Sequence, residues 1–164
     1  MKKSTGFTLI ELIITMVILA IVTMAAIPSF SNMIQNNKRA ADTNLLVSSI
    51  NFARTEAIKR GANVTFSTDG GLESGWCVHL GDAAGDCDDQ IRGFESSGNL
   101  TFTVKDDDDQ DVDDLVFDRR GFLVPQTALT VTVIPEECVS GNPDRRIIRV
   151  SPVGRTEIDE DPCP

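Results

Sequence analysis

The residue types most often used for metal binding and catalysis are scarce in this 164-residue chain. The only histidine, His79, lies in a strand-like pattern, and none of the four cysteines belongs to a Cys-x-x-Cys pair. Zinc sites need several ligands at short, regular spacings, so the sequence predicts no metal centre. No Gly-x-Ser-x-Gly segment is present to expose a nucleophilic serine. We therefore predict no catalytic residues, no cofactor and no enzyme activity.

A run of aspartates between Asp106 and Asp118 is the strongest candidate for a cation site. Alternate aspartates in this run loosely resemble the calcium loop of an EF-hand. However, Val112 stands where that loop requires a glycine, and Asp118 is shorter than the usual glutamate. We expect a solvated hairpin loop between Val104 and Leu115, and calcium binding by the run stays open.

The chain is acidic, with 25 Asp and Glu against 15 Lys and Arg and a formal net charge of -10. Proteins that bind nucleic acid present a basic surface, so this balance argues against nucleic acid as a partner. A weak DNA contact could come from four arginines near the C-terminus, but several acids follow them at 157–161. We expect these acids to pair with the arginines, which are Arg145, Arg146, Arg149 and Arg155.

An apolar run covers residues 7–27 and contains one charged residue, Glu11. As a helix, a run of this length crosses a hydrocarbon core of about 30 Å. Lys2 and Lys3 precede it, and positive charge keeps the N-terminus in the cytoplasm. The run is too long for an ordinary secretory signal and has no Ala-x-Ala site after it. Glu11 is costly in a membrane, and such a residue usually has a partner or a function.

A second helical pattern runs from Ser31 to Arg60 and ends before Gly61. We expect one long helix whose second half packs on a globular domain, because apolar residues recur there at helical spacing. Two helices hinged near Pro28 are the alternative. The predicted buried stripe consists of Leu46, Ile50, Ala53 and Ala57.

Beyond residue 62 the pattern changes to short alternating segments separated by turn residues. Together with the helix, these segments predict an α+β fold in which a long N-terminal helix packs on antiparallel β-sheets. The predicted strands are Asn63–Ser67, Trp76–Leu80, Gln90–Glu95, Leu100–Val104, Leu115–Phe117, Gly121–Val124, Leu129–Ile134 and Arg146–Val150.

The four cysteines all lie in the part of the chain expected outside the cytoplasm, where disulfides persist. Three pairings are possible. We favour the local pairing of Cys77 with Cys87 and of Cys138 with Cys163, which closes an acidic loop and ties down the C-terminal tail. Free buried thiols are the alternative.

The first residues carry a specific resemblance. Residues 2–12 read Lys-Lys-Ser-Thr-Gly-Phe-Thr-Leu-Ile-Glu-Leu, which resembles the class III leader of type IV pilins and type II secretion pseudopilins. The resemblance implies that prepilin peptidase cuts between Gly6 and Phe7 and that the new Phe7 amine is N-methylated. It also implies that Glu11 pairs with the Phe7 amine of a neighbouring subunit, a pair favoured in a low dielectric. Cleavage removes two lysines and changes the formal net charge from -10 to -12.

Later segments resemble the GspH-like domain of FimT/FimU-type minor pilins and of the type II secretion minor pseudopilin H. The family then implies two small antiparallel sheets, and we assign no chemistry to Arg54 or Glu56. The FimT branch binds DNA through a C-terminal Gly-Arg-x-Arg segment, whereas here Gly154 and Arg155 are followed by Thr156 and Glu157. The matching segments are residues 52–65, Gly75–Val78, Phe117–Gly121 and Ile147–Arg155.

The resemblance implies a leader at 1–6, a transmembrane and assembly helix at 7–28, an amphipathic helix half at 29–61 and a GspH-like β domain at 62–164. The expected function is that of a minor pilin that primes pilus assembly near the tip. A minor pseudopilin of a type II secretion system and a FimT-like DNA-binding pilin are the alternatives.

Expected partners are other major and minor pilins, prepilin peptidase and the inner-membrane assembly platform. The chain would first cross the inner membrane once, with its N-terminus in the cytoplasm and its domain in the periplasm. It would then move into a pilus at the cell surface.

Overall fold

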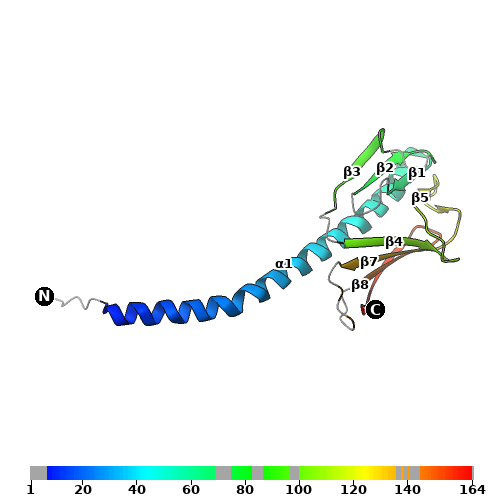
Figure 1. Cartoon of the computed structure of the whole chain (residues 1–164). Coiled ribbons are helices and arrows are strands. Elements are labelled where there is room, and N and C mark those ends of the chain that lie inside the picture. Colours follow the sequence, from blue (N-terminus) through cyan, green and yellow to red (C-terminus); the bar gives the residue numbers. More distant parts are fainter. Residues whose placement is uncertain are drawn as a thin grey trace. The chain divides into compact units, whose positions relative to one another are not determined.

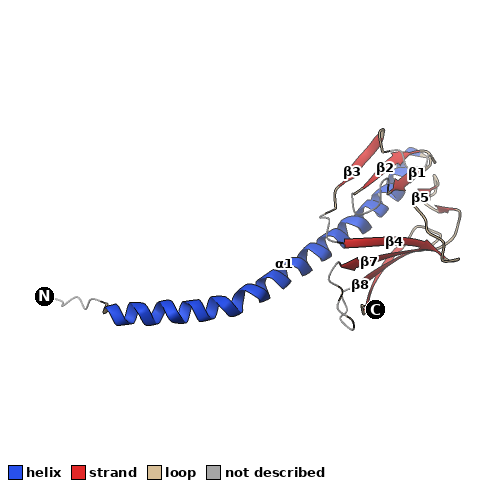
Figure 2. Cartoon of the chain, viewed as in Figure 1, coloured by secondary structure: helices blue, strands red, loops and turns tan. Residues whose placement is uncertain are grey.

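The computed structural model describes residues 7–68, 75–82, 87–96, 100–135, 138, 140 and 145–163, without the side chains of 25–29, 31, 32, 35 and 100. In this part of the chain, one helix is followed by nine strands (Figure 2). The chain divides into two compact units, one ending at Lys38 and one comprising Arg39–Pro164. Each unit is described by itself.

The helix α1 runs from Leu9 to Arg60 as a single element, as predicted. It continues through Pro28, where proline lacks an amide hydrogen and one helical hydrogen bond is therefore absent. The helix ends at the predicted place, because Gly61 adopts a left-handed φ of 64° and its amide donates to the carbonyl of Ala57 at 2.9 Å.

The first unit exposes its apolar side chains. From Phe7 to Met24, every large hydrophobic side chain is at least 47% exposed to solvent, and the exposed fraction of Phe7 reaches 86%. Judged on the side chains that are described, no helix is both long enough and apolar enough to span a membrane. The membrane segment predicted for residues 7–27 therefore stays a prediction.

The first sheet of the second unit has five antiparallel strands in the order β3-β2-β1-β5-β6. The central strand, β1, is buried along its whole length. Figure 1 shows β3, β2 and β1 side by side at one end of this unit. The strands are β1 (Val64–Ser67), β2 (Trp76–Leu80), β3 (Gln90–Phe94), β5 (Asp114–Phe117) and β6 (Leu123–Val124).

The second sheet has four antiparallel strands in the order β4-β7-β8-β9. In β7 buried and half-buried residues alternate strictly, so one face of this sheet packs on the core. The predicted α+β fold with antiparallel sheets is confirmed. The strands are β4 (Leu100–Asp106), β7 (Leu129–Pro135), β8 (Arg145–Val150) and β9 (Thr156–Asp161).

The last strand, β9, is absent from the strands predicted from the sequence. Its segment, Thr156–Asp161, contains four acids, and acidic residues are disfavoured in strands. The strand forms because it pairs in full antiparallel register with the arginine-containing β8. What looked like an acidic tail is therefore the edge strand of the second sheet.

The core joins the second half of α1 to both sheets (Figure 1). All four residues of the predicted stripe are completely buried, so the predicted helical face is confirmed. Trp76 is buried beside them, and its indole nitrogen donates to Ser49 Oγ at 2.6 Å. The fully buried residues include Leu46, Ile50, Ala53 and Ala57 of α1 with Phe66, Phe117, Val131 and Ile148 of the sheets.

Candidate assembly site

The N-terminus of α1 is capped by reciprocal hydrogen bonds between Thr8 and Glu11. The Thr8 amide donates to Glu11 Oε2 at 3.1 Å, and the Glu11 amide donates to Thr8 Oγ1 at 3.3 Å. The Thr8 hydroxyl also donates to Glu11 Oε2 at 3.0 Å. With Thr8 preceding the first helical residue, this arrangement is a capping box, which satisfies amide groups that a helix start leaves without a helical acceptor.

This capping box was missed in the sequence, although its signal, Thr-x-x-Glu before an apolar run, is present. It directs the Glu11 carboxylate toward the beginning of the chain, beside the exposed Phe7. The two hydrogen bonds that the Glu11 carboxylate accepts from Thr8 both end on Oε2. The other carboxylate oxygen, Oε1, keeps its capacity to accept a hydrogen bond from another donor. Gly6 lies outside the described residues, and the predictions of cleavage at Gly6 and methylation at Phe7 stay predictions.

Two disulfides stabilise the second unit. They join Cys77 to Cys87 and Cys138 to Cys163, with Cα–Cα distances of 5.9 and 5.6 Å. This is the pairing favoured from the sequence. The first disulfide links β2 to the residues before β3, and the second links the chain after β7 to the chain after β9.

The four arginines considered for DNA contact each lie against a carboxylate on β9 or beside it. The register of β8 and β9 places Arg145 and Arg146 directly opposite their acids and Arg149 diagonal to its acid, whereas Arg155 lies in the turn between the two strands. Phosphate would have to displace carboxylates that already neutralise the arginines, so the geometry gives no free basic patch at these positions. The ion pairs are Arg145–Asp161, Arg146–Glu160, Arg149–Asp159 and Arg155–Glu157.

The aspartate run forms a tight turn after β4, as a hairpin loop would. Asp106 Oδ1 accepts hydrogen bonds from the amides of Asp108 and Gln110 at 3.0 and 2.9 Å. Lys105 Nζ lies 2.8 Å from Asp109 Oδ1, and this hydrogen bond raises the pKa of Lys105. Within the described residues, no three His, Cys, Asp or Glu side chains gather as a metal site would require.

Two known family models match this chain. Residues 42–154 match the family described as "Type II transport protein GspH", and residues 1–27 match the "Prokaryotic N-terminal methylation motif". The first match alone covers more than half of the chain. This chain belongs to the GspH family.

Two solved structures show that the GspH-family fold of this chain is pilin-like. The type IV minor pilin FimU of Pseudomonas aeruginosa is similar over 75% of this chain and 89% of its own, with 23% sequence identity and a TM-score of 0.60. The minor pseudopilin EpsH from the Type 2 Secretion System of Vibrio cholerae is similar over 75% of this chain and 97% of its own, with 11% identity and a TM-score of 0.52. No curated protein matches the sequence.

The GspH-like segments that are far apart in the sequence meet around Arg54 of α1. Arg54 Nε donates to the carbonyl of Gly121 at 3.1 Å. Gly154 packs against both groups, since a Cβ at this position would lie 2.5 Å from the Gly121 oxygen and 2.7 Å from Arg54 Nε. We call Arg54, Gly121 and Gly154 the arginine clamp. The clamp fixes the turn after β5 and the turn between β8 and β9 on one helix.

Backbone conformation explains why the clamp uses glycines. Gly121 and Gly154 have φ values of 80° and 73°, in the left-handed region that favours glycine. The first turn is held by Asp118, whose Oδ1 accepts from the amides of Arg120 and Phe122 at 2.8 and 3.0 Å. The Phe122 bond, followed by those from Arg120, lowers the pKa of Asp118. These motifs therefore build the domain, and Arg54, to which we assigned no chemistry, has a structural role whose contacts the sequence did not reveal.

Proposed function

We propose that this chain is a minor pilin of a type IV pilus, a structural subunit that primes assembly near the filament tip. The observation that carries the proposal is the combination of an N-terminal methylation motif and a GspH domain in one chain whose fold resembles that of a minor pilin. Such a subunit needs no catalytic site, and we propose no enzyme activity.

In this proposal, residues 7–28 anchor the chain in the inner membrane, with the domain in the periplasm. Prepilin peptidase removes residues 1–6 by cutting after Gly6, and Phe7 is N-methylated. The assembly platform then transfers the subunit into the filament among major and minor pilins. The capping box supports a role for Glu11, because it holds the carboxylate beside the first residue of the processed chain.

A minor pseudopilin of a type II secretion system is the second candidate. The similarity to EpsH and the description of the family favour it. The two functions use the same fold and differ in what the filament serves, so a cellular readout has to separate them. A DNA-binding pilin is not supported, since the candidate arginines are paired with acids.

The test is a clean deletion in the native host, with a complemented control, examined by electron microscopy for surface filaments and by assay for exported proteins. We expect the deletion to abolish or strongly reduce pili and the complemented strain to recover them. Normal pili together with a loss of protein export would contradict the proposed function and favour that of a type II secretion pseudopilin. Complementation by a Glu11→Gln chain tests the carboxylate in the same assay, and we expect fewer pili than with the unchanged chain.

A further inference from the structure

The two sheets have four edge strands, and they differ in how well each edge is protected. An unprotected edge presents unpaired amide and carbonyl groups to which another strand can add. The edge strand β6 has only two residues and is followed by Pro125, which has no amide hydrogen. The edge strand β9 carries four acids in six residues. Short length, proline and charge are the usual means of preventing strand addition.

The edge of β4 is partly covered by the chain itself. The amide of Val112 donates to the carbonyl of Val104 at 3.0 Å, and Lys105 forms a bridge with Asp111. Because β7 occupies the opposite side of β4, this hairpin must lie along the outer edge. The second half of β4 therefore has no free edge.

The edge of β3 has none of these protections. It is five residues long, lacks proline and pairs with β2 alone among the described strands. Its one charged residue, Arg92, folds over aromatic rings, with its guanidinium carbon 4.9 Å from the centre of Phe94 and 5.7 Å from that of Phe52. Gly93, in the second half of the strand, has no side chain, and a glycine in a strand allows another backbone to approach closely.

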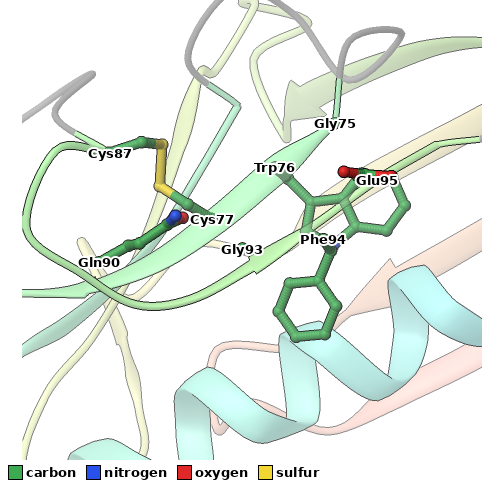
Figure 3. A pocket seen from close by; sticks show the side chains of 8 residues that line it. All are labelled: Gly75, Trp76, Cys77, Cys87, Gln90, Gly93, Phe94 and Glu95. Carbon is green, nitrogen blue, oxygen red and sulfur yellow. A yellow bond between two sulfur atoms is a disulfide. The ribbon is translucent and has the colours of Figure 1, made fainter.

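A hollow of about 450 Å³ adjoins this edge (Figure 3). Figure 3 shows the Cys77–Cys87 disulfide and Gln90 on one side of it and the rings of Trp76 and Phe94 on the other. The atoms nearest to a Cβ on Gly93 would all belong to the side-chain amide of Gln90, with its oxygen at 2.7 Å, so the missing side chain helps to open the hollow. We call this space the β3 hollow.

The charge around the β3 hollow indicates what could enter it. Glu95 lines it, and the exposed Asp89 stands just before β3. Arg92 is paired with Val78 and lies on the opposite face of the strand from Gly93, where its guanidinium carbon is 4.9 Å from the centre of the Phe94 ring, one of the rings that line the hollow. A side chain entering beside Gly93 therefore meets a carboxylate and an amide. A second copy of this acidic chain would bring its own Glu95 and Asp89 to the same edge, so a basic segment of another chain fits better.

We propose that β3 is a docking strand that accepts an extended, basic segment of another pilin-like subunit, with a lysine or arginine of that segment in the β3 hollow. Backbone hydrogen bonds along β3 would supply affinity, and the contact with Glu95 would supply selectivity. This inference rests on the proposed function, because that function supplies neighbouring subunits in the filament.

The test is photo-cross-linking of the full chain in its native cells, with a small diazirine side chain at Gln90 on β3 or, as a matched control, at the exposed Val124 on the protected edge strand β6. Cross-linked peptides are identified by mass spectrometry. We expect Gln90 to cross-link to one other pilin-like subunit, within an extended segment that contains lysine or arginine, and Val124 not to do so. Equal labelling from the two positions, labelling of a helix, or labelling of a second copy of this chain would overturn the proposal.

Two substitutions test the hollow itself. Gly93→Leu places a side chain in the hollow, where its Cβ first meets the flexible end of Gln90, and Glu95→Arg reverses the charge of that lining residue. Each should lower the cross-linked fraction about tenfold, because steric blocking and like-charge repulsion both oppose docking. Fluorescence of the buried Trp76 checks that each variant is folded. An unchanged cross-linked fraction in folded Glu95→Arg would overturn the inference even if Gly93→Leu failed to fold.

The same strains separate this inference from the proposed function. Loss of pili on deletion, with no cross-link from Gln90 to a pilin-like subunit, would overturn strand docking and leave the minor-pilin function in place. Normal pili on deletion, with a cross-link from Gln90 to a basic segment of a pseudopilin, would support strand docking and overturn the pilus function.

Discussion

The two halves of α1 are built from similar apolar residues but have opposite surroundings. In the first half, Ile13, Val17 and Ile21 are about half exposed or more. In the second half, Leu46 and Ile50 are completely buried against strands of both sheets. Burial of one such side chain contributes about 1.5–3 kcal/mol to folding. The first half gains nothing comparable within this chain.

This difference separates the two tasks of the helix. The apolar face of the second half is already buried in its own domain, so these apolar residues stabilise the fold. The described side chains of the first half are largely apolar and exposed, and under the proposed function a lipid bilayer or other helices would cover them. A single long helix can therefore connect a folded domain to an assembly.

The strongest test of the comparison truncates one isoleucine in each half. Ile50→Ala should reduce the free energy of unfolding of the domain by about 2–5 kcal/mol, because it leaves a cavity in the core. Ile13→Ala should leave that free energy unchanged. Both full chains can be unfolded with denaturant in detergent micelles, with the fluorescence of the one tryptophan, Trp76, as the probe of the domain. Equal losses in the two variants would show that the halves do not differ as proposed.

A smaller effect is expected at the arginine clamp, where the domain is attached to the helix. Gly154→Ala should lower the free energy of unfolding by about 2 kcal/mol or more, since alanine is strained at φ 73° and its Cβ meets the Gly121 oxygen. Gly61→Ala is the matched control, because Gly61 is also left-handed but a Cβ there meets nothing within 4 Å. We expect about 1 kcal/mol for that control. A larger loss at Gly61 than at Gly154 would contradict a role for close packing in the clamp.

The sequence predicted the helix better than the contacts that attach it. Helical spacing identified Leu46, Ile50, Ala53 and Ala57 as one face, because burial of that face is a local property of the pattern. Eight of the nine strands were also predicted, with differences at their ends. The missing strand, β9, depends on ion pairs with β8, which no local pattern of alternating hydrophobic residues reveals.

The arginine clamp could not be predicted for a similar reason. Arg54, Gly121 and Gly154 are separated by long stretches of sequence, and only the fold brings Arg54 within hydrogen-bond distance of Gly121 and packs Gly154 against both. Gly121 was predicted to begin a strand, Gly154 was noted only in a segment that resembles the family, and the acceptor of Arg54 was not predicted. In contrast, the capping box of Thr8 and Glu11 is local, and its Thr-x-x-Glu spacing would have been sufficient to predict it, although it was missed.

Each unit also contains a carboxylate that fixes backbone amides, and in the domain this predicts a pH dependence. Hydrogen bonds from Phe122 and Arg120 lower the pKa of Asp118. A lowered pKa means that the stabilisation is complete above the unfolded value of about 3.9 and is lost as the pH falls through the lower folded value. Asp118→Asn keeps an oxygen acceptor but cannot titrate.

Thermal unfolding of the full chain and of Asp118→Asn between pH 6 and pH 2.5 measures this contribution. We expect the unchanged chain to have the higher Tm at pH 6 and the gap in Tm to narrow as the pH falls below about 4. A gap that stays constant across this range would show that ionisation of Asp118 does not contribute.

The smallest expected effect is at the start of α1. Thr8→Ala removes the hydroxyl that caps the Glu11 amide, at a cost of about 1 kcal/mol that is confined to the first turn. Amide exchange of the first helical residues in micelles should become several-fold faster, in line with the roughly fivefold change that about 1 kcal/mol produces, whereas exchange in β1 should not change. Thr8→Ser is the control, since serine keeps the capping oxygen. Faster exchange in β1 would mean that the start of the helix is coupled to the domain, and the two halves of α1 would then not act as independent parts.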